Sequence, residues 1–279
     1  TLQIDADKTY GISANKTLEI LQHLYELKYT TYPRSDCQFL PESQRKDALE
    51  IASLMNEKLA IELGLIPCIA KNNPNLNNSP VFNDKKITAH HAIIPTKVVP
   101  ILSSLSEDEK KIYLLIAKKY AGIFMNPYTY EKTEVIGRIE GYPFKFICKN
   151  IIDPGYTIYY PERTEKDKET PSISGKLSPG ERLNVSKVEK KEERTQPPKR
   201  YTEGTLIAAM ANIKSENEEL NETLAEIKGI GTPATRANII ETIIKVDKHV
   251  LKKGKSLYPT EKGKQLVEFL PKILTEADY

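Results

Sequence analysis

The sequence predicts a multidomain α+β fold in which a helical segment, a β-rich segment and a second helical segment follow one another. Two observations predict it: apolar residues recur mainly at helical spacing over residues 1–125 and 201–279, and they alternate in short runs within residues 126–200. At 279 residues the chain can also bury more than one core. We therefore expect three domains, with boundaries near residues 125 and 200.

The first segment is predicted to contain three main helices. Ser13 or Asn15 is available to cap a helix that runs to about Leu27, and Pro33 requires the helical pattern to end before it. Pro41 suits the first turn of a second helix. The capping-box spacing of Ser106 and Glu109 predicts a third helix that ends near Phe124, while the polar residues 71–86 indicate a surface loop.

The second segment reads as strands. Short alternating runs flank Glu140-Gly141, a turn pair, and are followed by the breaker Asp153-Pro154-Gly155. Residues 162–176 are charged and poor in apolar side chains, which indicates a loop between strands. The alternation roughly resumes at three further apolar residues, namely Leu183, Val185 and Val188.

The third segment returns to helical spacing at Tyr201 and continues as a long polar helix to about Ile227, where Gly229-Ile230-Gly231 stops it. Thr232 is placed to cap the next helix, with Pro233 at its first position. A turn at 252–255, a short strand at 257–259 and a final helix opened by Thr260 then predict a winged-helix-like arrangement.

Composition excludes some classes of protein and leaves others open. A net charge of +3 permits nucleic-acid binding without requiring it. Cys37, Cys68 and Cys148 are widely separated, odd in number and without a CxxC pair, so neither a disulfide framework nor a zinc site is indicated, and a reducing cytoplasm fits. No apolar run approaches the length of a membrane span, so we expect no membrane partner.

The stretch Tyr32-Pro33-Arg34 suggests chemistry. Because Pro33 biases Tyr32 towards an extended backbone, the side chains of Tyr32 and Arg34 are expected to project on one side. A tyrosine hydroxyl has a pKa of about 10, and a neighbouring guanidinium can offset part of the cost of its oxyanion while gripping a phosphate. The pattern indicates attack of a tyrosine oxygen on a phosphodiester. The alternative is that Tyr32 packs in a strand and Arg34 pairs with Asp36 or Glu26.

Two further motifs have both a functional and a purely structural interpretation. His90 and His91 could supply a metal ligand or be ordinary, partly buried imidazoles, although adjacent histidines rarely face one site. The helix that starts after Gly231 offers free N–H groups to a phosphate, or is simply a well-capped helix.

Four runs of the sequence resemble the type IA DNA topoisomerases, most closely the bacterial topoisomerase III branch. LQHLYELKYTTYPRSDCQFL (21–40) is similar to the active-tyrosine segment, and AHHAIIPT, YTEGTLI and GIGTPATRA follow in the order that the family has. The family's metal-binding Toprim domain precedes this region, and the chain begins at Thr1, so the resemblance implies an excised fragment.

The resemblance also implies residue roles. Tyr32 would be the nucleophile, Arg34 and His90 would stabilise the phosphate or place the tyrosine, and Glu26 would manage a proton or order Arg34. The family often has an Arg-Gly pair near the end of the helix after Gly231, where this chain reads Lys245-Val246-Asp247-Lys248-His249, so Lys245 or Lys248 would take over a contact. The resemblance thus implies strand contacts by Gln22, Thr235 and Lys245, while Thr31 is a further candidate by its position next to Tyr32 and Arg236 by its charge.

The implied activity is ATP-independent change of DNA topology: single-strand cleavage through a 5′-phosphotyrosine, strand passage and religation. Mg²⁺ would be needed in the intact enzyme, held by the Toprim domain, and this fragment is expected to bind no metal and to be inactive alone. The β segment would form part of an arch around duplex DNA. We expect a bacterial, cytoplasmic monomer that acts on nucleoid or plasmid DNA. The alternative is a non-catalytic single-stranded-DNA-binding module.

Overall fold

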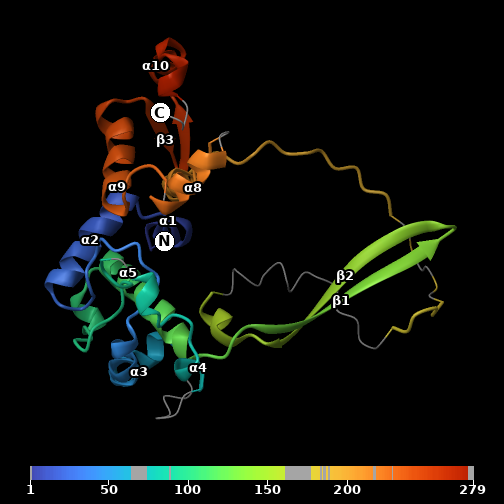
Figure 1. Cartoon of the computed structure of the whole chain (residues 1–279), viewed down its shortest axis with the longest axis horizontal. Coiled ribbons are helices and arrows are strands. Elements are labelled where there is room, and N and C mark those ends of the chain that lie inside the picture. The colour runs from blue at the N-terminus through green and yellow to red at the C-terminus, as the bar shows by residue number, and fades with distance from the viewer. Residues whose placement is uncertain are drawn as a thin grey trace.

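The computed structural model describes residues 2–63, 74–87, 89–160, 177–182, 184, 187, 189–215, 218–227 and 229–275. Over these residues a helical body carries a long β-hairpin that projects away from it. A second helical unit, formed by the C-terminal residues, lies above the body in the view of Figure 1. The mixed α+β class is confirmed. The division into three domains at residues 125 and 200 stays a prediction.

The helical body is built from residues 2–125 and encloses one large core. Ser13 caps α2, and Ser106 with Glu109 forms the expected capping box of α5, so both predictions are confirmed. The largest fully buried side chains include Leu24, Met55 and Tyr113. Its α-helices are α1 (Leu2–Tyr10), α2 (Ala14–Glu26), α3 (Arg45–Leu63), α4 (Pro74–Asn77) and α5 (Glu107–Ala121).

Two parts of this body differ from the sequence prediction. The first helix, α1, was not expected, because its buried residues include Gln3 and Asp7, which no apolar pattern marks. The segment read as a loop over 71–86 contains α4 and a 3₁₀ turn at Asp84–Lys86 in its described part. A further 3₁₀ turn, Gly122–Phe124, extends α5 to the predicted end.

The hairpin consists of β1 (Thr129–Ile139) and β2 (Tyr142–Asp153), paired antiparallel from Ile139 opposite Tyr142 back to Thr129 opposite Asp153. Glu140 and Gly141 form the predicted turn, both with positive φ, as a two-residue turn of type I′ requires. The predicted loop 162–176 and the strand residues Leu183, Val185 and Val188 lie outside the described residues.

The C-terminal unit places a hairpin between two helices, as expected. Thr232 caps α9 with a proline in its first turn, and Thr260 caps α10. The polar helix is shorter than predicted, because α7 ends at Ala211 and is capped by Asn212, whose side chain donates to the Ala208 carbonyl. The elements are α7 (Glu203–Ala211), α8 (Glu218–Glu226), α9 (Pro233–Glu241), a π-helical turn (Thr242–Val246), β3 (Val250–Lys253), β4 (Ser256–Pro259) and α10 (Glu261–Phe269).

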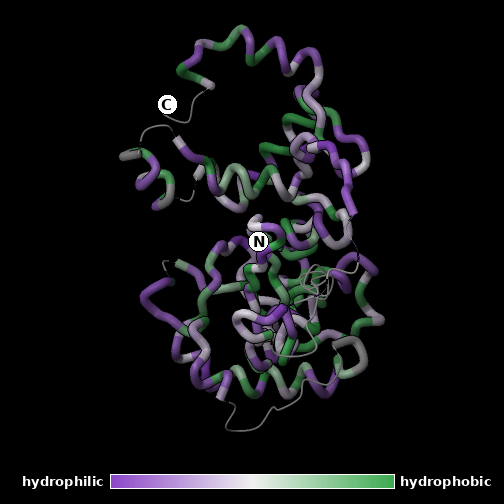
Figure 2. Tube along the Cα trace, turned by 90° about the vertical axis from the view of Figure 1, so that its right-hand side faces the viewer, coloured by the Kyte–Doolittle hydropathy of each residue, from purple (hydrophilic) through white to green (hydrophobic). Residues whose placement is uncertain are grey.

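Two buried carboxylates join the C-terminal unit to the body. Asp7 Oδ2 accepts hydrogen bonds from the Gly204 N–H at 3.0 Å and the Thr202 hydroxyl at 2.5 Å. Glu203 accepts from the Ala14 N–H at 3.0 Å and from Lys252 Nζ. Figure 2 shows the N-terminus where the two helical units meet. The run YTEGTLI therefore docks α7 on α1 and on the start of α2.

No helix within the described ranges is both long enough and apolar enough to cross a membrane.

Candidate functional site

The site is organised around the residues that follow α2, which we call the tyrosine loop (residues 29–37). Helix α2 ends in a Schellman motif: the Tyr29 N–H donates to the Leu24 carbonyl at 2.9 Å, and the Lys28 N–H donates to the Tyr25 carbonyl at 2.8 Å. Lys28 occupies the left-handed position of this motif, with φ of 63°. The loop therefore leaves the helix in a fixed direction.

Lys28 gives the first testable prediction. A left-handed backbone disfavours residues with a Cβ atom, so Lys28→Gly should raise the free energy of unfolding by about 1 kcal/mol. Lys28→Ala is the matched control, since it removes the charge and keeps Cβ. Denaturant unfolding of both variants isolates the backbone effect, and equal stabilities for glycine and alanine would contradict it.

The tyrosine loop is pinned to residues 92–96. The Thr31 N–H donates to the Ile94 carbonyl at 3.0 Å, while the Thr31 hydroxyl donates to the Ala92 carbonyl at 3.1 Å and accepts from the Ile94 N–H at 2.9 Å. The Thr96 N–H donates to the Tyr29 carbonyl at 3.1 Å. The segment that follows His90 is thereby held beside Tyr32.

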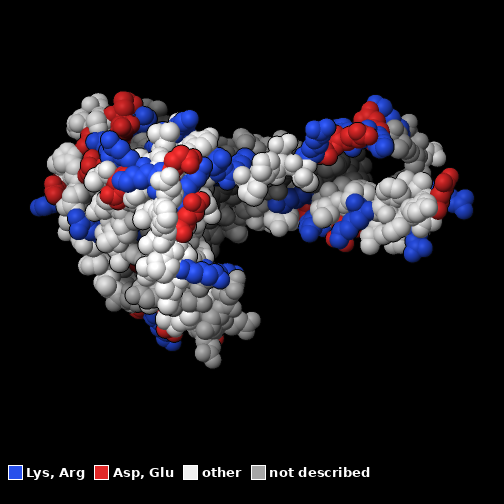
Figure 3. Space-filling view, turned by 90° about the horizontal axis from the view of Figure 1, so that it is seen from above, with Lys and Arg blue, Asp and Glu red and all other residues white. Residues whose placement is uncertain are grey.

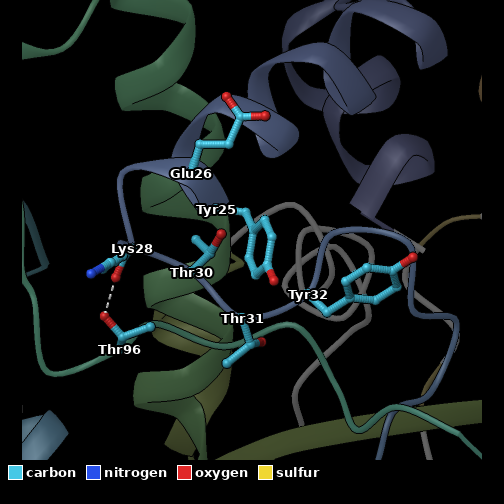
Figure 4. Close-up of a pocket in the computed structure, with 7 residues that line it drawn as sticks. All are labelled: Tyr25, Glu26, Lys28, Thr30, Thr31, Tyr32 and Thr96. Atoms are coloured by element: carbon cyan, nitrogen blue, oxygen red, sulfur yellow. Dashed lines mark hydrogen bonds between the residues drawn. The ribbon is translucent and has the colours of Figure 1, made fainter.

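Tyr32 is half-buried and touches two other rings. Its ring lies over the His90 imidazole, with centroids 4.1 Å apart and an interplanar angle of 31°. Tyr25 meets it at 90°, with centroids 6.0 Å apart. A shallow pocket of about 560 Å³ is lined by Tyr25 and Tyr32 among others, and the Tyr32 hydroxyl points away from the other residues that line it (Figure 4).

The two histidines face different partners. His91 Nε2 lies 3.0 Å from the side-chain nitrogen of Gln44, and His91 Nδ1 lies 2.8 Å from the Ala92 carbonyl. His90 instead stacks on Tyr32, and its carbonyl accepts from the Ser35 hydroxyl at 3.3 Å. The structure thus brings His90 to the tyrosine and leaves His91 as a partly buried imidazole with protein partners.

Arg34 and Glu26 do not pair with each other. Arg34 is exposed, and no salt bridge engages it within the part of the chain that the structure describes. Glu26 accepts from the Gln22 amide at 2.8 Å, and its carboxylate points away from Tyr32 (Figure 4). The pair of Arg34 with Glu26, which the sequence left open as an alternative, is therefore not formed.

The strand-contact candidates of α9 and the turn after it already have partners in the protein. Thr235 accepts from the Thr232 N–H at 2.8 Å as part of the helix cap. Arg236 is 5 % exposed and donates to the carbonyls of Ile230 and Gly231 at 2.7 and 2.9 Å. Lys245 forms a salt bridge with Glu241 at 2.5 Å. Their roles as DNA contacts stay predictions.

Arg236 also connects the C-terminal unit to the tyrosine loop. Burial lowers the pKa of its guanidinium, and the negative charge of Asp36 partly offsets that change. Both residues line one cleft of about 1150 Å³, together with Pro33, Ser35 and Cys37. One side of this cleft is therefore the tyrosine loop, and the other includes α9.

Sequence reasoning missed three residues that hold or flank the site. Asp7 and Gln44 belong to no recognisable sequence motif, because their hydrogen-bond partners, Gly204 and His91, lie far away along the chain. Tyr25 counted only as an apolar residue at helical spacing, although it touches Tyr32.

Known proteins resemble the whole chain. A family model described as DNA topoisomerase matches residues 1–279. DNA topoisomerase 3 of Bacillus licheniformis is 40% identical over 98% of this chain and 38% of its own length, and that of Bacillus subtilis is 38% identical over the same shares. DNA topoisomerase 3 of Pasteurella multocida is 37% identical over 99% of the chain and 42% of its own length.

The chain thus spans about two fifths of the length of these curated relatives. The match covers the helical body, the hairpin and the C-terminal unit alike, and it includes the tyrosine loop with its stacked histidine. The resemblance seen in four short runs extends to the full sequence, and the chain belongs to the type IA DNA topoisomerases.

Proposed function

We propose that this chain carries the nucleophile of an ATP-independent type IA topoisomerase, with Tyr32 as the residue that joins DNA. The observation that carries the proposal is the presentation of the Tyr32 hydroxyl, away from its pocket, on a ring that His90 stacks against. An anchored loop on one side, and an exposed arginine two residues later that forms no salt bridge with the described residues, complete a site suited to a phosphodiester.

The proposed reaction exchanges one phosphodiester bond for another, so that the number of such bonds is unchanged. The Tyr32 oxygen attacks the phosphorus of a single strand; the bond from tyrosine oxygen to phosphorus forms, and the bond from phosphorus to the 3′ oxygen breaks. The phenol loses its proton and the departing 3′ oxygen gains one. The 5′-phosphate stays on Tyr32 while another strand or duplex passes, and the 3′-hydroxyl then reverses the transfer without ATP.

Arg34 and His90 would act on the charge of the phosphate. A guanidinium offers forked donors that match phosphoryl oxygens, so Arg34 would bind the non-bridging oxygens as negative charge develops on them. His90 would hold the Tyr32 ring and offer an imidazole N–H to the same phosphate. The Glu26 carboxylate is hydrogen-bonded to Gln22 and points away from Tyr32, so it would have to turn towards Tyr32 to receive the phenol proton or to order Arg34.

Arg34 gives a second prediction. Arg34→Lys keeps the charge and loses the fork, so we expect cleavage about tenfold slower at saturating strand concentration. The measurement is the single-turnover rate of adduct formation by the intact protein. Lys28→Arg is the control, because Lys28 is an exposed basic residue just after the end of α2. An Arg34→Lys variant that cleaves at the wild-type rate would exclude bidentate binding of the phosphate by Arg34.

Strand binding is proposed to involve residues of both helical units. Gln22, Thr235 and Lys245 would contact the strand directly, while Thr31 and Arg236 would act by fixing the tyrosine loop and the turn before α9. Lysine and arginine side chains gather on the face that includes the C-terminal unit, with acidic residues interspersed (Figure 3). The lysine and arginine side chains of this mixed surface would contact the phosphates, although the net charge is only +3.

The hairpin and the rest of the intact protein complete the proposal. The hairpin projects from the body, and residues 189–200 return towards α7 (Figure 1), so the two would form part of an arch around duplex DNA. Within the described ranges no group of three His, Cys, Asp or Glu residues is placed to hold a metal ion. Mg²⁺, when bound, supplies positive charge at the phosphate, and we propose that its ligands come from the remainder of a monomeric, cytoplasmic enzyme.

A strand oligonucleotide labelled at its 3′ end tests the function. With Mg²⁺ the intact protein should retain the label in a denaturation-resistant adduct, because the 5′-phosphate side stays on the protein. A mixture of this chain with a separately produced Toprim domain of the same protein should also retain the 3′ label in such an adduct. A 5′-end label trapped instead would contradict the proposed polarity.

A second candidate function is strand binding without catalysis by this chain alone. It is favoured by the described residues alone, among which no group of three His, Cys, Asp or Glu side chains is placed to hold a metal ion. The isolated chain is a strand-binding module if it binds the strand without forming adduct, while its mixture with the Toprim domain does form adduct in the same assay.

A further inference from the structure

The Tyr32 ring is held on two sides, and one of the two contacts has no assigned role. His90 lies over the ring face, while Tyr25, in the last turn of α2, meets it at a right angle. We infer that Tyr25 is a positioning residue for cleavage: its ring fixes the direction of the Tyr32 side chain, so that the hydroxyl points out of the pocket (Figure 4). This inference rests on the function proposed for Tyr32.

Tyr25 is not explained by the core of the helical body. The face of α2 that enters the core consists of Ala14, Thr17, Ile20, Leu21 and Leu24. Tyr25 lies outside that face, and 40 % of it is exposed. Among the described aromatic residues Tyr32 is the one ring that Tyr25 contacts. Removing the Tyr25 ring should therefore leave the fold intact and free Tyr32.

Both ends of this ring pair have an anchored backbone. The Tyr25 carbonyl accepts the Lys28 N–H within the Schellman motif, and Thr31, next to Tyr32, is bonded to residues 92–94 through its N–H and its hydroxyl. The remaining freedom of the nucleophile is rotation of its own side chain. An edge-to-face neighbour restricts that rotation, and a nucleophile misplaced by an ångström reacts far more slowly.

The geometry separates this role from two others. A perpendicular ring contact requires the aromatic ring and makes no use of the Tyr25 hydroxyl, so a proton-transfer role for that hydroxyl predicts a different response to Tyr25→Phe. A direct strand contact would change strand affinity, whereas positioning changes the rate once the strand is bound.

The experiment compares variants of the intact protein in single-turnover cleavage of a labelled strand with Mg²⁺. Tyr25→Ala should form adduct about tenfold more slowly at saturation, with the strand dissociation constant within about twofold of the wild-type value. Tyr25→Leu, which keeps apolar bulk without a ring, should be slow as well, and Tyr25→Phe should restore the rate. Tyr10→Ala is the matched control, because Tyr10 is 36 % exposed at the end of α1.

Three results would overturn the inference: wild-type rates in the alanine and leucine variants, a phenylalanine variant as slow as alanine, or weaker strand binding with an unchanged saturating rate. Wild-type protein that forms no adduct under any condition refutes the proposed function and removes the reaction that Tyr25 would serve. Adduct in the wild type with no effect at Tyr25 refutes the positioning role alone.

Discussion

Replacing Tyr32 with phenylalanine should abolish the covalent adduct between the intact protein and a single strand while sparing strand binding. The substitution removes one oxygen, and that oxygen is the proposed nucleophile. The ring, its stacking on His90 and its contact with Tyr25 are retained, so the site keeps its shape. Adduct should fall below detection, a loss of more than about a thousandfold, because the substitution removes the attacking atom itself.

The neighbouring Tyr29 supplies a matched control. It lies on the same loop, packs against Tyr113 and has its carbonyl bonded to Thr96, so Tyr29→Phe removes a hydroxyl three residues from the nucleophile without touching it. Adduct should persist in this variant at a rate near that of the wild type. Adduct that survives in Tyr32→Phe and disappears in Tyr29→Phe would move the nucleophile to Tyr29.

The parts of the fold that depend on neighbouring residues could be predicted from the sequence. Caps at Ser13, Ser106 and Thr232 act over three or four residues, and Glu140-Gly141 encodes its own turn, so each was found where it was expected. These features need no knowledge of the tertiary structure.

The parts of the fold that depend on contacts between residues far apart along the chain could not be predicted from the sequence. Asp7 and Gln3 are buried in α1 because the C-terminal unit covers them, and a polar pattern alone suggests the opposite. Arg236 was expected at a DNA surface on the basis of its charge, whereas its guanidinium is buried and holds the turn before α9.

Reasoning from the residues could not choose between His90 and His91, since both imidazoles sit in the same short run. The family resemblance selected His90, and the structure brings that ring to Tyr32 while His91 meets Gln44. Tyr25 could not be found in this way, because a tyrosine at helical spacing is equally consistent with a place in the core.

Asp7→Ala should destabilise the chain by about 3 to 5 kcal/mol, since it leaves buried donors without their charged acceptor. The Gly204 N–H and the Thr202 hydroxyl both donate to Asp7 Oδ2, and the carboxylate is 3 % exposed. The contact is tight, since a Cβ atom at position 204 would lie 2.8 Å from Asp7 Oδ2 and 3.2 Å from the Ile4 Cα atom. Denaturant unfolding measures the loss.

The response at Asp7 also tests whether the C-terminal unit unfolds with the helical body. If docking through Asp7 and Glu203 couples them, the wild-type chain should unfold in one transition, and Asp7→Ala should either shift it or split off an earlier step from α7–α10. Asp5 lies on the same helix as Asp7 and forms a partly exposed pair with Lys119 of α5, so Asp5→Ala should cost less than about 1 kcal/mol. Equal effects at positions 5 and 7 would mean that the buried hydrogen bonds do not couple the units, and that the cleft between the tyrosine loop and α9 is held by apolar packing.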